Sequence, residues 1–381
     1  MKKDKKKKKS RKGLPLWIKV TIGMVVMGGI IASIVSLDLV RKVYMPNVEI
    51  KNTDKNYLFI PTGSSYEDVK KIIVSSGIIK DPGSFDWVAK KMNYRNHIHP
   101  GKYRLKAGMS NKALILMLRG GNQEPVMLRI KPFRNASSLA GYIARNLEAD
   151  SVTLAAILSD KPFLREHNLT RENVLGAFIP NTHEFYWNTN SREFFDRMIV
   201  EFAAFWTEQR RSKAQAAGLT PMEVITLASI VVQETNLKDE MPVIAGVYLN
   251  RLRKGWKLQA DPTLVFIMEN LEDERVMEFR KRYERNPGRR VKRVLKAHKE
   301  FDSPYNTYLY FGLPPGPITM PEISAIDAVL NSTVHNYMFF CARPDLTGHD
   351  FAVTYEDHQL NAKRYQAAIS RRGDGADETN E

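Results

Sequence analysis

The chain has 381 residues, of which 43% are hydrophobic and 26% are charged, and its formal net charge is +16. This length suits about two domains of roughly 150 residues each, and the composition is that of a globular protein, so a mini-protein and a wholly disordered chain are excluded. The single cysteine, Cys341, excludes an intrachain disulfide.

Most of the positive charge lies in two short segments. Residues 1–13 contain nine Lys and Arg against one Asp, and residues 273–300 contain eleven against five acidic residues. The rest of the chain is nearly neutral. A nucleic-acid-binding domain usually spreads its basic residues over a broad face with aromatic or base-reading side chains, so no nucleic-acid partner is expected.

A long apolar segment follows the basic tail, and residues 14–38 are predicted to form a transmembrane helix. About 20 apolar residues span the ~30 Å hydrocarbon layer, and residues 20–37 carry no charge. The positive-inside rule places the tail of residues 1–13 in the cytoplasm and the rest of the chain outside it. The alternatives are a cleaved signal peptide, whose apolar core would be ~7–15 residues long, and a buried soluble helix, which rarely has nine positive charges beside it.

Residues 39–56 are expected to be a stalk, and residues 57–131 a small α+β module. Short strands and helices alternate there, with Ser110 as a helix cap and a last strand at about residues 126–130. Such modules resemble LysM-like glycan binders, and a spacer domain is the alternative.

Residues 132–370 are expected to form a mainly helical catalytic domain with short strands, followed by a disordered polar tail at residues 371–381. The predicted fold class is therefore α+β. The clearest helix start is at Thr220, because Glu223 three residues later completes a capping box and Pro221 takes the first helical position. The residues that follow are apolar on nearly every side, so this helix should lie deep in the domain.

The predicted helix ends at Glu234, whose carboxyl group lies at the edge of an apolar stripe. Burial disfavours the charged form of a carboxyl group and raises its pKa, which is the condition for a general acid at neutral pH. In the alternative interpretation, Glu234 caps a neighbouring segment or pairs with Arg251 or Arg253.

Six motifs follow one another in the chain: ASIVVQET, VYLNRL, LQADPT, SPYNTY, GLPPGPI and GHDFAVTYEDHQLNAKRY. Over about residues 57–366 the chain resembles the endolytic murein transglycosylases of the YceG-like family. The resemblance implies that Glu234 is the catalytic acid. The family often has a second glutamate two residues earlier, where this chain has Val232, so Glu234 is the only carboxylate of the motif.

A second family segment appears here as VLGAFIPNTHEFYW and departs from the family pattern. Leu175 and Asn181 occupy positions where acidic residues are usual, and His183 replaces a tyrosine. If those acidic residues bind substrate in relatives, the changes put substrate affinity in doubt rather than the chemistry.

The resemblance implies cleavage of the β-1,4 bond between N-acetylmuramic acid and N-acetylglucosamine within a glycan strand, giving 1,6-anhydro ends. It implies action on nascent strands at the bacterial inner membrane, with the catalytic domain in the periplasm. Peptidoglycan, the lipid bilayer and membrane-bound wall synthases are the implied partners, and no cofactor is expected. The alternatives are a glycan-binding scaffold and a lysozyme-like hydrolase.

Polar residues of LQADPT and SPYNTY are candidate substrate contacts, because they lie on probable loops beside prolines. Tyr305 is expected to stack on a sugar face, and Asp261 is the second carboxylate if a hydrolytic mechanism operates. The alternative is that Asp261 and Asn306 cap turns and helices. The full candidate set is Gln259, Asp261, Thr263, Ser303, Tyr305, Asn306 and Thr307.

No metal site is expected. His97 and His99 have no third ligand nearby, and a structural hydrogen-bonding role is expected for His349, Glu356 and His358 because the sequence lacks an HExxH pattern. The basic segment, residues 273–300, departs from the more compact family pattern. It could meet anionic lipid head groups or the carboxylates of wall peptides, or it could be a solvated surface.

Overall fold

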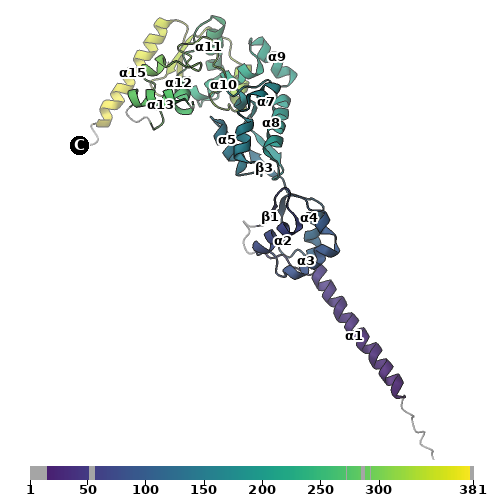
Figure 1. The fold of residues 1–381 in the computed structure, drawn as a ribbon. Helices are drawn as coiled ribbons and strands as arrows, with labels where there is room; N and C mark the ends of the chain where they lie inside the picture. The colour runs from purple at the N-terminus through teal and green to yellow at the C-terminus, as the bar shows by residue number, and fades with distance from the viewer. Residues whose placement is uncertain (1–14, 51–55, 272, 285–287, 292, 378–381) are drawn as a thin grey trace, which may run out of the picture. The chain divides into compact units, whose positions relative to one another are not determined.

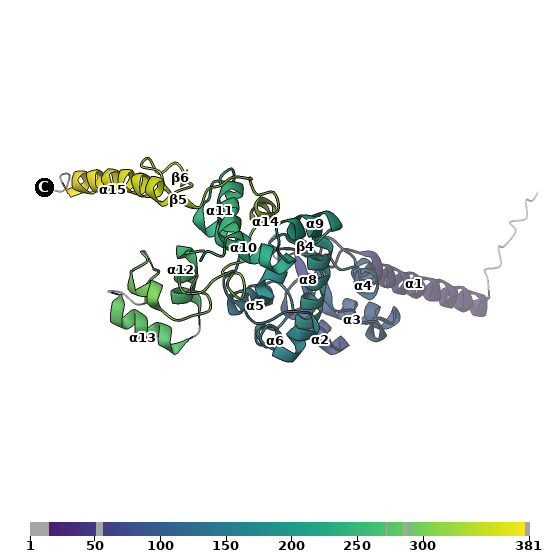
Figure 2. The same cartoon turned by 90° about the horizontal axis from the view of Figure 1, so that it is seen from above.

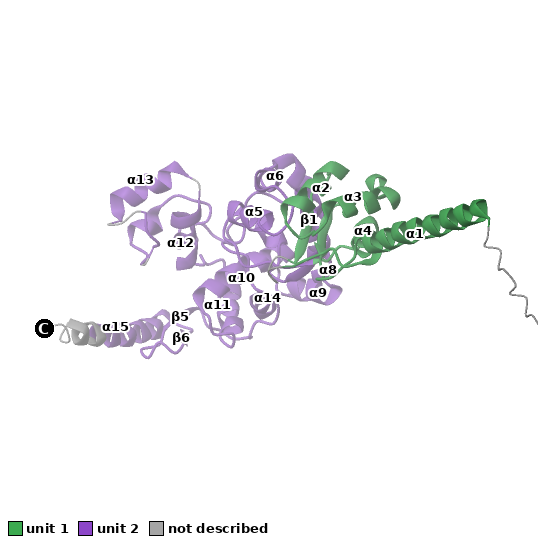
Figure 3. Cartoon of the chain, turned by 90° about the horizontal axis from the view of Figure 1, so that it is seen from below, with its two compact units in different colours: residues 1–125 green, residues 126–381 purple. Residues whose placement is uncertain are grey.

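A computed structural model describes residues 15–50, 56–271, 273–284, 288–291 and 293–377. Figure 1 shows the elements of the chain. The chain divides into two compact units, residues 1–125 and residues 126–381, which Figure 3 shows in green and purple. Most of the structure is helical, and three two-stranded antiparallel sheets complete it. The predicted α+β character and the apolar N-terminal helix are thus confirmed.

The first unit begins with the 29-residue helix α1 (Leu16–Tyr44), which contains no buried residue. It is long and apolar enough to cross a membrane. The helix runs past the predicted end at residue 38, and its last turns pack against α3 (Pro82–Lys91) and α4 (Asn111–Arg119) (Figure 1). The backbone carbonyl of Lys42 accepts a hydrogen bond of 2.9 Å from Nδ2 of Asn111 on α4.

The rest of this unit encloses a small apolar core. The sheet pairs Leu58 with Tyr103, both almost fully buried, and Ser65 and Ser110 accept capping hydrogen bonds at the starts of α2 and α4. The elements are β1 (Tyr57–Ile60), α2 (Tyr66–Ser75), α3 (Pro82–Lys91), the 3-10 helix η2 (Tyr94–Asn96), β2 (Gly101–Arg104) and α4 (Asn111–Arg119).

The prediction of a stalk at residues 39–56 is wrong over its first part, which belongs to α1 and to the folded unit. Asn47 is 5% exposed and Val48 is 1% exposed, so both belong to the folded unit. The Asn47 side chain donates to Oδ1 of Asn111 at 2.7 Å and accepts from the backbone N–H of Asp81 at 2.8 Å. Residues 51–55 lie outside the described residues.

The second unit starts with β3 (Val126–Arg129), which pairs with β4 (Thr182–Phe185). The sequence places this strand in the first module, so the predicted boundary at residue 131 is late and the units divide after Pro125. An aromatic and aliphatic core lies between the two strands and their helices, which are α5 (Ala136–Ala144), α6 (Ser151–Ile157), α7 (Lys161–Glu166), the 3-10 helix η3 (Val174–Ala177) and α8 (Ser191–Phe205).

Helix α10 (Pro221–Glu234) is the central helix of the second unit. The predicted capping box between Thr220 and Glu223 is present, and every residue from 224 to 231 is buried. Figure 2 shows α10 among α11, α12 and α14, which all contact it. The remaining elements are α9 (Glu208–Ala216), α11 (Met241–Arg253), α12 (Asp261–Asn270), α13 (Glu274–Tyr283), the 3-10 helix η4 (Ala297–Glu300), α14 (Ile323–Leu330), β5 (Phe339–Ala342), β6 (His349–Ala352) and α15 (Tyr355–Asp377).

Candidate active site

Glu234 is the last residue of α10, and its half-buried side chain faces a cavity of about 310 Å³. We call this the Glu234 cavity. Asp261 at the start of α12 lies on the same wall, so two carboxyl groups from different helices meet here. The remaining lining residues are Arg134, Gln233, Pro262, Val265, Phe266 and Ile318.

The surroundings of Glu234 raise the pKa of its carboxyl group to about 7. Burial is the largest cause, and the nearby negative charge of Asp261 adds to it. A hydrogen bond from the Tyr248 hydroxyl and the positive charge of Arg251 oppose the shift. Glu234 is therefore divided between its acid and carboxylate forms near neutral pH, as a group that both donates and accepts a proton requires.

Tyr248 on α11 is the direct partner of the Glu234 carboxyl group. Its hydroxyl donates to Oε1 of Glu234 at 2.5 Å, and its side chain is 1% exposed. Burial raises the pKa of Tyr248 well above its ordinary value, so the hydroxyl keeps its proton and stays a donor.

The basic residues of α11 do not pair with Glu234. Arg251 is buried, and its guanidinium donates to the backbone carbonyls of Met338 and Leu258. Among the described residues, neither Arg251 nor Arg253 forms an ion pair with the Glu234 carboxylate. The alternative in which Glu234 pairs with one of these arginines is thus not supported.

Of the seven candidate substrate contacts, two reach the surface. Asp261 is exposed, lines the Glu234 cavity and accepts a hydrogen bond of 2.5 Å from the Tyr308 hydroxyl. Gln259 is exposed as well, with a left-handed backbone at φ 52°, and its N–H donates to the carbonyl of Thr307 at 3.0 Å.

The other five candidates are buried. Thr307 accepts from the N–H of Ala260 at 3.0 Å, and Thr263 donates to the carbonyl of Ala260 at 2.7 Å. Asn306 donates to the carbonyl of Phe301 at 2.8 Å, which is the turn-capping role that the alternative predicts. Ser303 accepts from the N–H of Tyr305 at 3.3 Å. These side chains hold the loops in place and do not face the cavity.

The expectation that Tyr305 stacks on a sugar is corrected by its position. The ring is 6% exposed and packs on Phe266, with 4.8 Å between the ring centroids. Its hydroxyl donates to the carbonyl of Glu172 at 3.3 Å. Tyr305 therefore supports the cavity wall from behind, because Phe266 lies between it and the cavity.

The departures from the family pattern lie away from Glu234. Leu175 packs against the apolar core of the first half of the unit, whereas Asn181 and His183 line a separate cavity of about 260 Å³. Burial lowers the pKa of His183, although its neighbour Glu201, 3.8 Å from the ring, opposes this. None of the three lines the Glu234 cavity.

Sequence reasoning missed Arg134, which precedes α5 and reaches the end of α10. Its guanidinium donates to Oε1 of Gln233 at 2.8 Å and pairs with Glu269 at 3.1 Å. A lone arginine roughly a hundred residues before Glu234 carries no local signal of this contact. Tyr248 was missed for a similar reason, although it lies in the motif VYLNRL.

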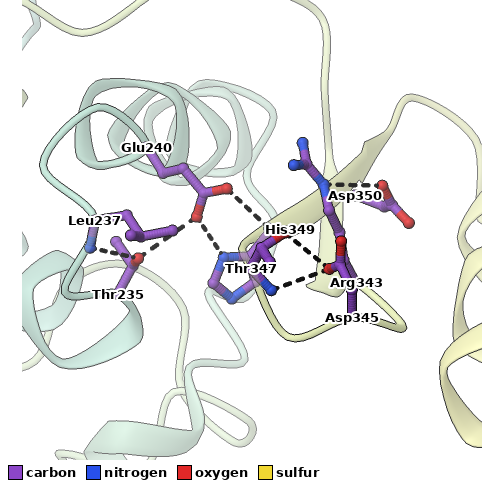
Figure 4. Close-up of polar contacts among 8 residues, drawn as sticks. All are labelled: Thr235, Leu237, Glu240, Arg343, Asp345, Thr347, His349 and Asp350. Carbon is purple, nitrogen blue, oxygen red and sulfur yellow. Dashed lines mark hydrogen bonds and ion pairs between the residues drawn. The ribbon is translucent and has the colours of Figure 1, made fainter. Parts of the chain in front are cut away.

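The loop after Glu234 is hydrogen-bonded to the β5–β6 hairpin (Figure 4). Glu240 accepts hydrogen bonds from the N–H of His349 at 2.8 Å and from its ring Nδ1 at 2.7 Å. Thr235, the next residue after Glu234, approaches Glu240 at 3.5 Å and accepts from the N–H of Leu237 at 3.0 Å. Burial alone would raise the pKa of Glu240, but the His349 contacts hold it below its ordinary value. The predicted structural hydrogen bond of His349 is confirmed.

Within the ranges that the structure describes, no three His, Cys, Asp or Glu side chains gather closely enough to hold a metal ion. The polar groups around Glu234 are thus carboxyl, hydroxyl, amide and guanidinium groups. Such a set can exchange protons and form hydrogen bonds with a polar substrate.

A family model described as the YceG-like family matches residues 58–364. A protein named endolytic murein transglycosylase from Bacillus subtilis strain 168 is 25% identical over 322 residues, which cover 80% of this chain and 83% of that protein. Proteins of the same name from Streptococcus pneumoniae strains D39 and R6 are 24% and 25% identical. The match covers 80% of this chain but only 57% of each streptococcal protein.

A solved structure is similar in fold. The crystal structure of a yceG-like protein from Listeria monocytogenes superposes with a TM-score of 0.50 at 23% sequence identity. The superposition covers 80% of this chain and 99% of the Listeria chain.

Proposed function

Because this chain belongs to the YceG-like family, we propose that it is an endolytic murein transglycosylase that cuts the β-1,4 bond between N-acetylmuramic acid and N-acetylglucosamine inside a glycan strand. The observation that carries the proposal is Glu234, a half-buried carboxyl group with a pKa of about 7 on the wall of a cavity. The relatives that bear this enzyme name match over 80% of the chain.

Glu234 acts twice in the proposed reaction. In its protonated form it donates a proton to the glycosidic oxygen, the bond from this oxygen to C1 of the muramoyl residue breaks, and the N-acetylglucosamine 4-hydroxyl leaves. The Glu234 carboxylate then takes the proton of the muramoyl 6-hydroxyl while that oxygen bonds to C1. The products are a 1,6-anhydro end and a protonated Glu234, and no water is consumed.

The intramolecular nucleophile removes the need for a second carboxylate. Most glycosidases use a second one to activate water or to attack C1, whereas a hydroxyl held within the same sugar has the advantage of proximity. Tyr248 supports this role, because its hydrogen bond holds one oxygen of Glu234 and leaves the other for the substrate.

We also propose that α1 anchors the enzyme in the bacterial inner membrane, with the N-terminus in the cytoplasm and the catalytic unit in the periplasm. The length and apolar surface of α1 support the anchor, and the basic residues 1–13 support the orientation. An enzyme held there would meet nascent strands and end their elongation, beside membrane-bound wall synthases. The LysM-like character of the first unit stays a prediction, with a spacer as the alternative.

Asp261 supports one competing function, a lysozyme-like hydrolase, because it shares the wall of the Glu234 cavity. In such an enzyme, Asp261 would activate water or attack C1. Its hydrogen bond from Tyr308 suits the alternative in which Asp261 only orders the cavity wall. A glycan-binding scaffold is the remaining alternative.

Mass spectrometry of the products decides among these functions. Purified full-length protein incubated with isolated glycan strands should release products with anhydro-muramoyl ends, which are one water lighter than reducing ends. Glu234→Gln should lower the rate roughly 100-fold to 10,000-fold, the usual loss of a general acid–base group. Reducing ends alone would establish a hydrolase, and cleavage undiminished by Glu234→Gln would refute the role of Glu234.

A further inference from the structure

Described residues of the basic segment, Arg280 and residues 288–290, border a second cavity next to the Glu234 cavity. This cavity measures about 490 Å³, and we call it the arginine cavity. Four arginines and one acidic residue line it: Arg134, Arg280, Arg289, Arg290 and Glu269. It is therefore strongly cationic. The start of helix α5, with its cap Asn135, lies on the same lining and adds the positive end of a helix dipole.

Two of the four arginines are occupied by the protein itself. Arg280 is 6% exposed, pairs with Glu284 at 2.9 Å and donates to the carbonyl of Met268 at 2.9 Å. Arg134 pairs with Glu269. Arg289 and Arg290 are exposed, and in the described part of the chain neither forms an ion pair. They are the side chains available to a ligand.

The arginine cavity adjoins the candidate active site, because Arg134 lines both cavities. Its Nη2 donates to Oε1 of Gln233, the neighbour of Glu234, and its Nη1 donates to Oε2 of Glu269. Glu269 in turn accepts the backbone N–H of Val291 in the basic segment at 2.7 Å. Gln233, Arg134, Glu269 and Val291 thus form a chain of hydrogen bonds from the residue before Glu234 to the segment that carries Arg289 and Arg290.

We propose that the arginine cavity binds a carboxylate of the peptide that branches from the glycan strand while Glu234 cuts the strand. The inference rests on the proposed function, because a murein strand carries peptides on its muramoyl residues and these peptides end in carboxylates. Guanidinium groups bind carboxylates through paired hydrogen bonds. Anionic lipid head groups share the negative charge, but binding them would not require a position beside the Glu234 cavity.

Steady-state kinetics of the full-length protein in lipid nanodiscs tests the inference. The test variant is Arg289→Ala/Arg290→Ala, and the matched control is Lys281→Ala/Arg282→Ala. The control removes two exposed charges from the same basic segment, and neither residue lines the arginine cavity. The three substrates are peptide-bearing strands, strands stripped of peptide by an amidase, and peptide-bearing strands whose carboxylates are chemically amidated.

The test variant should raise KM for peptide-bearing strands roughly 10-fold to 100-fold, the loss expected for charge-assisted hydrogen bonds, with kcat unchanged. It should leave KM for stripped and amidated strands within about twofold of wild type, and the control variant should behave as wild type on all three. Equal effects of the two variants, or an equal rise of KM on stripped strands, would overturn the inference.

Two further experiments distinguish lipid binding from peptide binding, and peptide binding from cleavage. Nanodiscs with and without phosphatidylglycerol should give the same discrimination between strands; a defect of the test variant that requires anionic lipid and ignores the peptide would assign the cavity to head groups instead. Binding of peptide-bearing and stripped strands is measured with Glu234→Gln, with and without the arginine substitutions. If the wild-type protein cuts no strand, the proposed function is refuted. The binding comparison between peptide-bearing and stripped strands would still confirm or overturn the peptide site.

Discussion

The carboxyl group of Glu234 is subject to two opposed influences. Burial and the charge of Asp261 favour its neutral form, whereas the hydrogen bond from Tyr248 favours the carboxylate. The group is divided between the two forms near neutral pH because burial outweighs the opposing contacts and raises its pKa to about 7. Substituting Tyr248 should therefore alter the pKa of Glu234 while leaving its carboxyl group in place.

Replacing Tyr248 with phenylalanine should move the alkaline limb of the pH profile of kcat/KM to higher pH. Removing the donor removes the influence that lowers the pKa of Glu234, so the acid form persists further into the alkaline range. Tyr305→Phe is the matched control, because it removes the hydroxyl of another buried tyrosine that contacts the Glu172 carbonyl instead. A limb that stays in place, or moves to lower pH, would contradict the assignment.

The raised pKa of Glu234 also predicts how its removal changes stability. Below about pH 4.5, the ordinary pKa, the side chain is protonated in both the folded and the unfolded protein. As the pH rises toward about 7, the unfolded chain loses this proton while the folded protein retains it, so the wild-type protein loses stability. Glu234→Gln should therefore unfold at nearly the wild-type temperature in acid and at a higher temperature above about pH 7. Thermal unfolding followed by circular dichroism measures this difference, and a gap that shrinks with rising pH would contradict it.

The position of Glu234 at the buried end of a helix can be predicted from the sequence because the information is local, whereas its proposed role rests on the family resemblance. The capping box at Thr220 fixes where α10 begins, and the apolar positions between fix which side of its last turn is buried. The contribution of Tyr248 is not local. It depends on how α11 packs against α10, which no spacing along the chain reveals.

The loop of residues 235–240 connects the end of α10 to the start of α11. Its conformation is set by the contact of Glu240 with His349, more than a hundred residues later on the β5–β6 hairpin. Gly348 permits this approach, because a Cβ there would lie 2.3 Å from Oε1 of Glu240. The hairpin therefore acts on the site by holding the residues that follow Glu234.

His349→Ala should destabilise the second unit by about 1–3 kcal/mol, since it leaves the carboxylate of Glu240 short of a hydrogen bond. It should also lower kcat more than it raises KM, because the end of α10 loses its support while the cavity lining is unchanged. Thr347→Ala is the control on the same hairpin, where the side chain donates a hydrogen bond to the exposed Asp345. His349→Asn, which can still donate a hydrogen bond, should restore part of kcat; equal losses in the alanine variants would refute a specific effect of His349.

At the level of elements, the sequence predicts helices better than the partners of its short strands. The strand at residues 126–129 is recognisable, yet its partner β4 begins more than fifty residues later, so its assignment to the first module is wrong. The SPYNTY segment shows a second limit. Its polar side chains suggest substrate contacts, but a tight buried loop must satisfy its own backbone groups, and Asn306 and Thr307 are used for that purpose.

At the scale of the whole molecule, the end of α1 joins the proposed membrane anchor to the rest of the first unit. Lys42, Asn47 and Val48 all contact the unit, through hydrogen bonds to Asn111 and Asp81 and through burial of the Val48 side chain. The prediction of a stalk is therefore wrong at Asn47 and Val48, which are buried in the first unit.

Two truncations should distinguish the anchor from the folded junction. Deleting residues 1–38 removes the apolar segment and keeps these contacts, so the protein should need no detergent and should keep the thermal stability of its first unit. Deleting residues 1–50 also removes Asn47 and Val48 and leaves Asn111 and Asp81 short of partners, which should cost about 2–4 kcal/mol. Thermal melting of both proteins in detergent-free buffer measures the difference, and equal stabilities would show that residues 39–50 contribute nothing to the fold.

The unbroken passage of α1 into the first unit has a geometric consequence. If α1 spans the bilayer, the direction in which the first unit faces along the membrane is set by helical phase. One alanine inserted between Val35 and Asp38 would turn the unit by about 100° around the helix axis and lift it by about 1.5 Å. Seven inserted residues, close to two full turns, would return it almost to its original bearing at a height of roughly 10 Å more. The number of residues in α1 would then determine which way the enzyme faces at the membrane. Its activity in cells should vary periodically with the number of residues inserted.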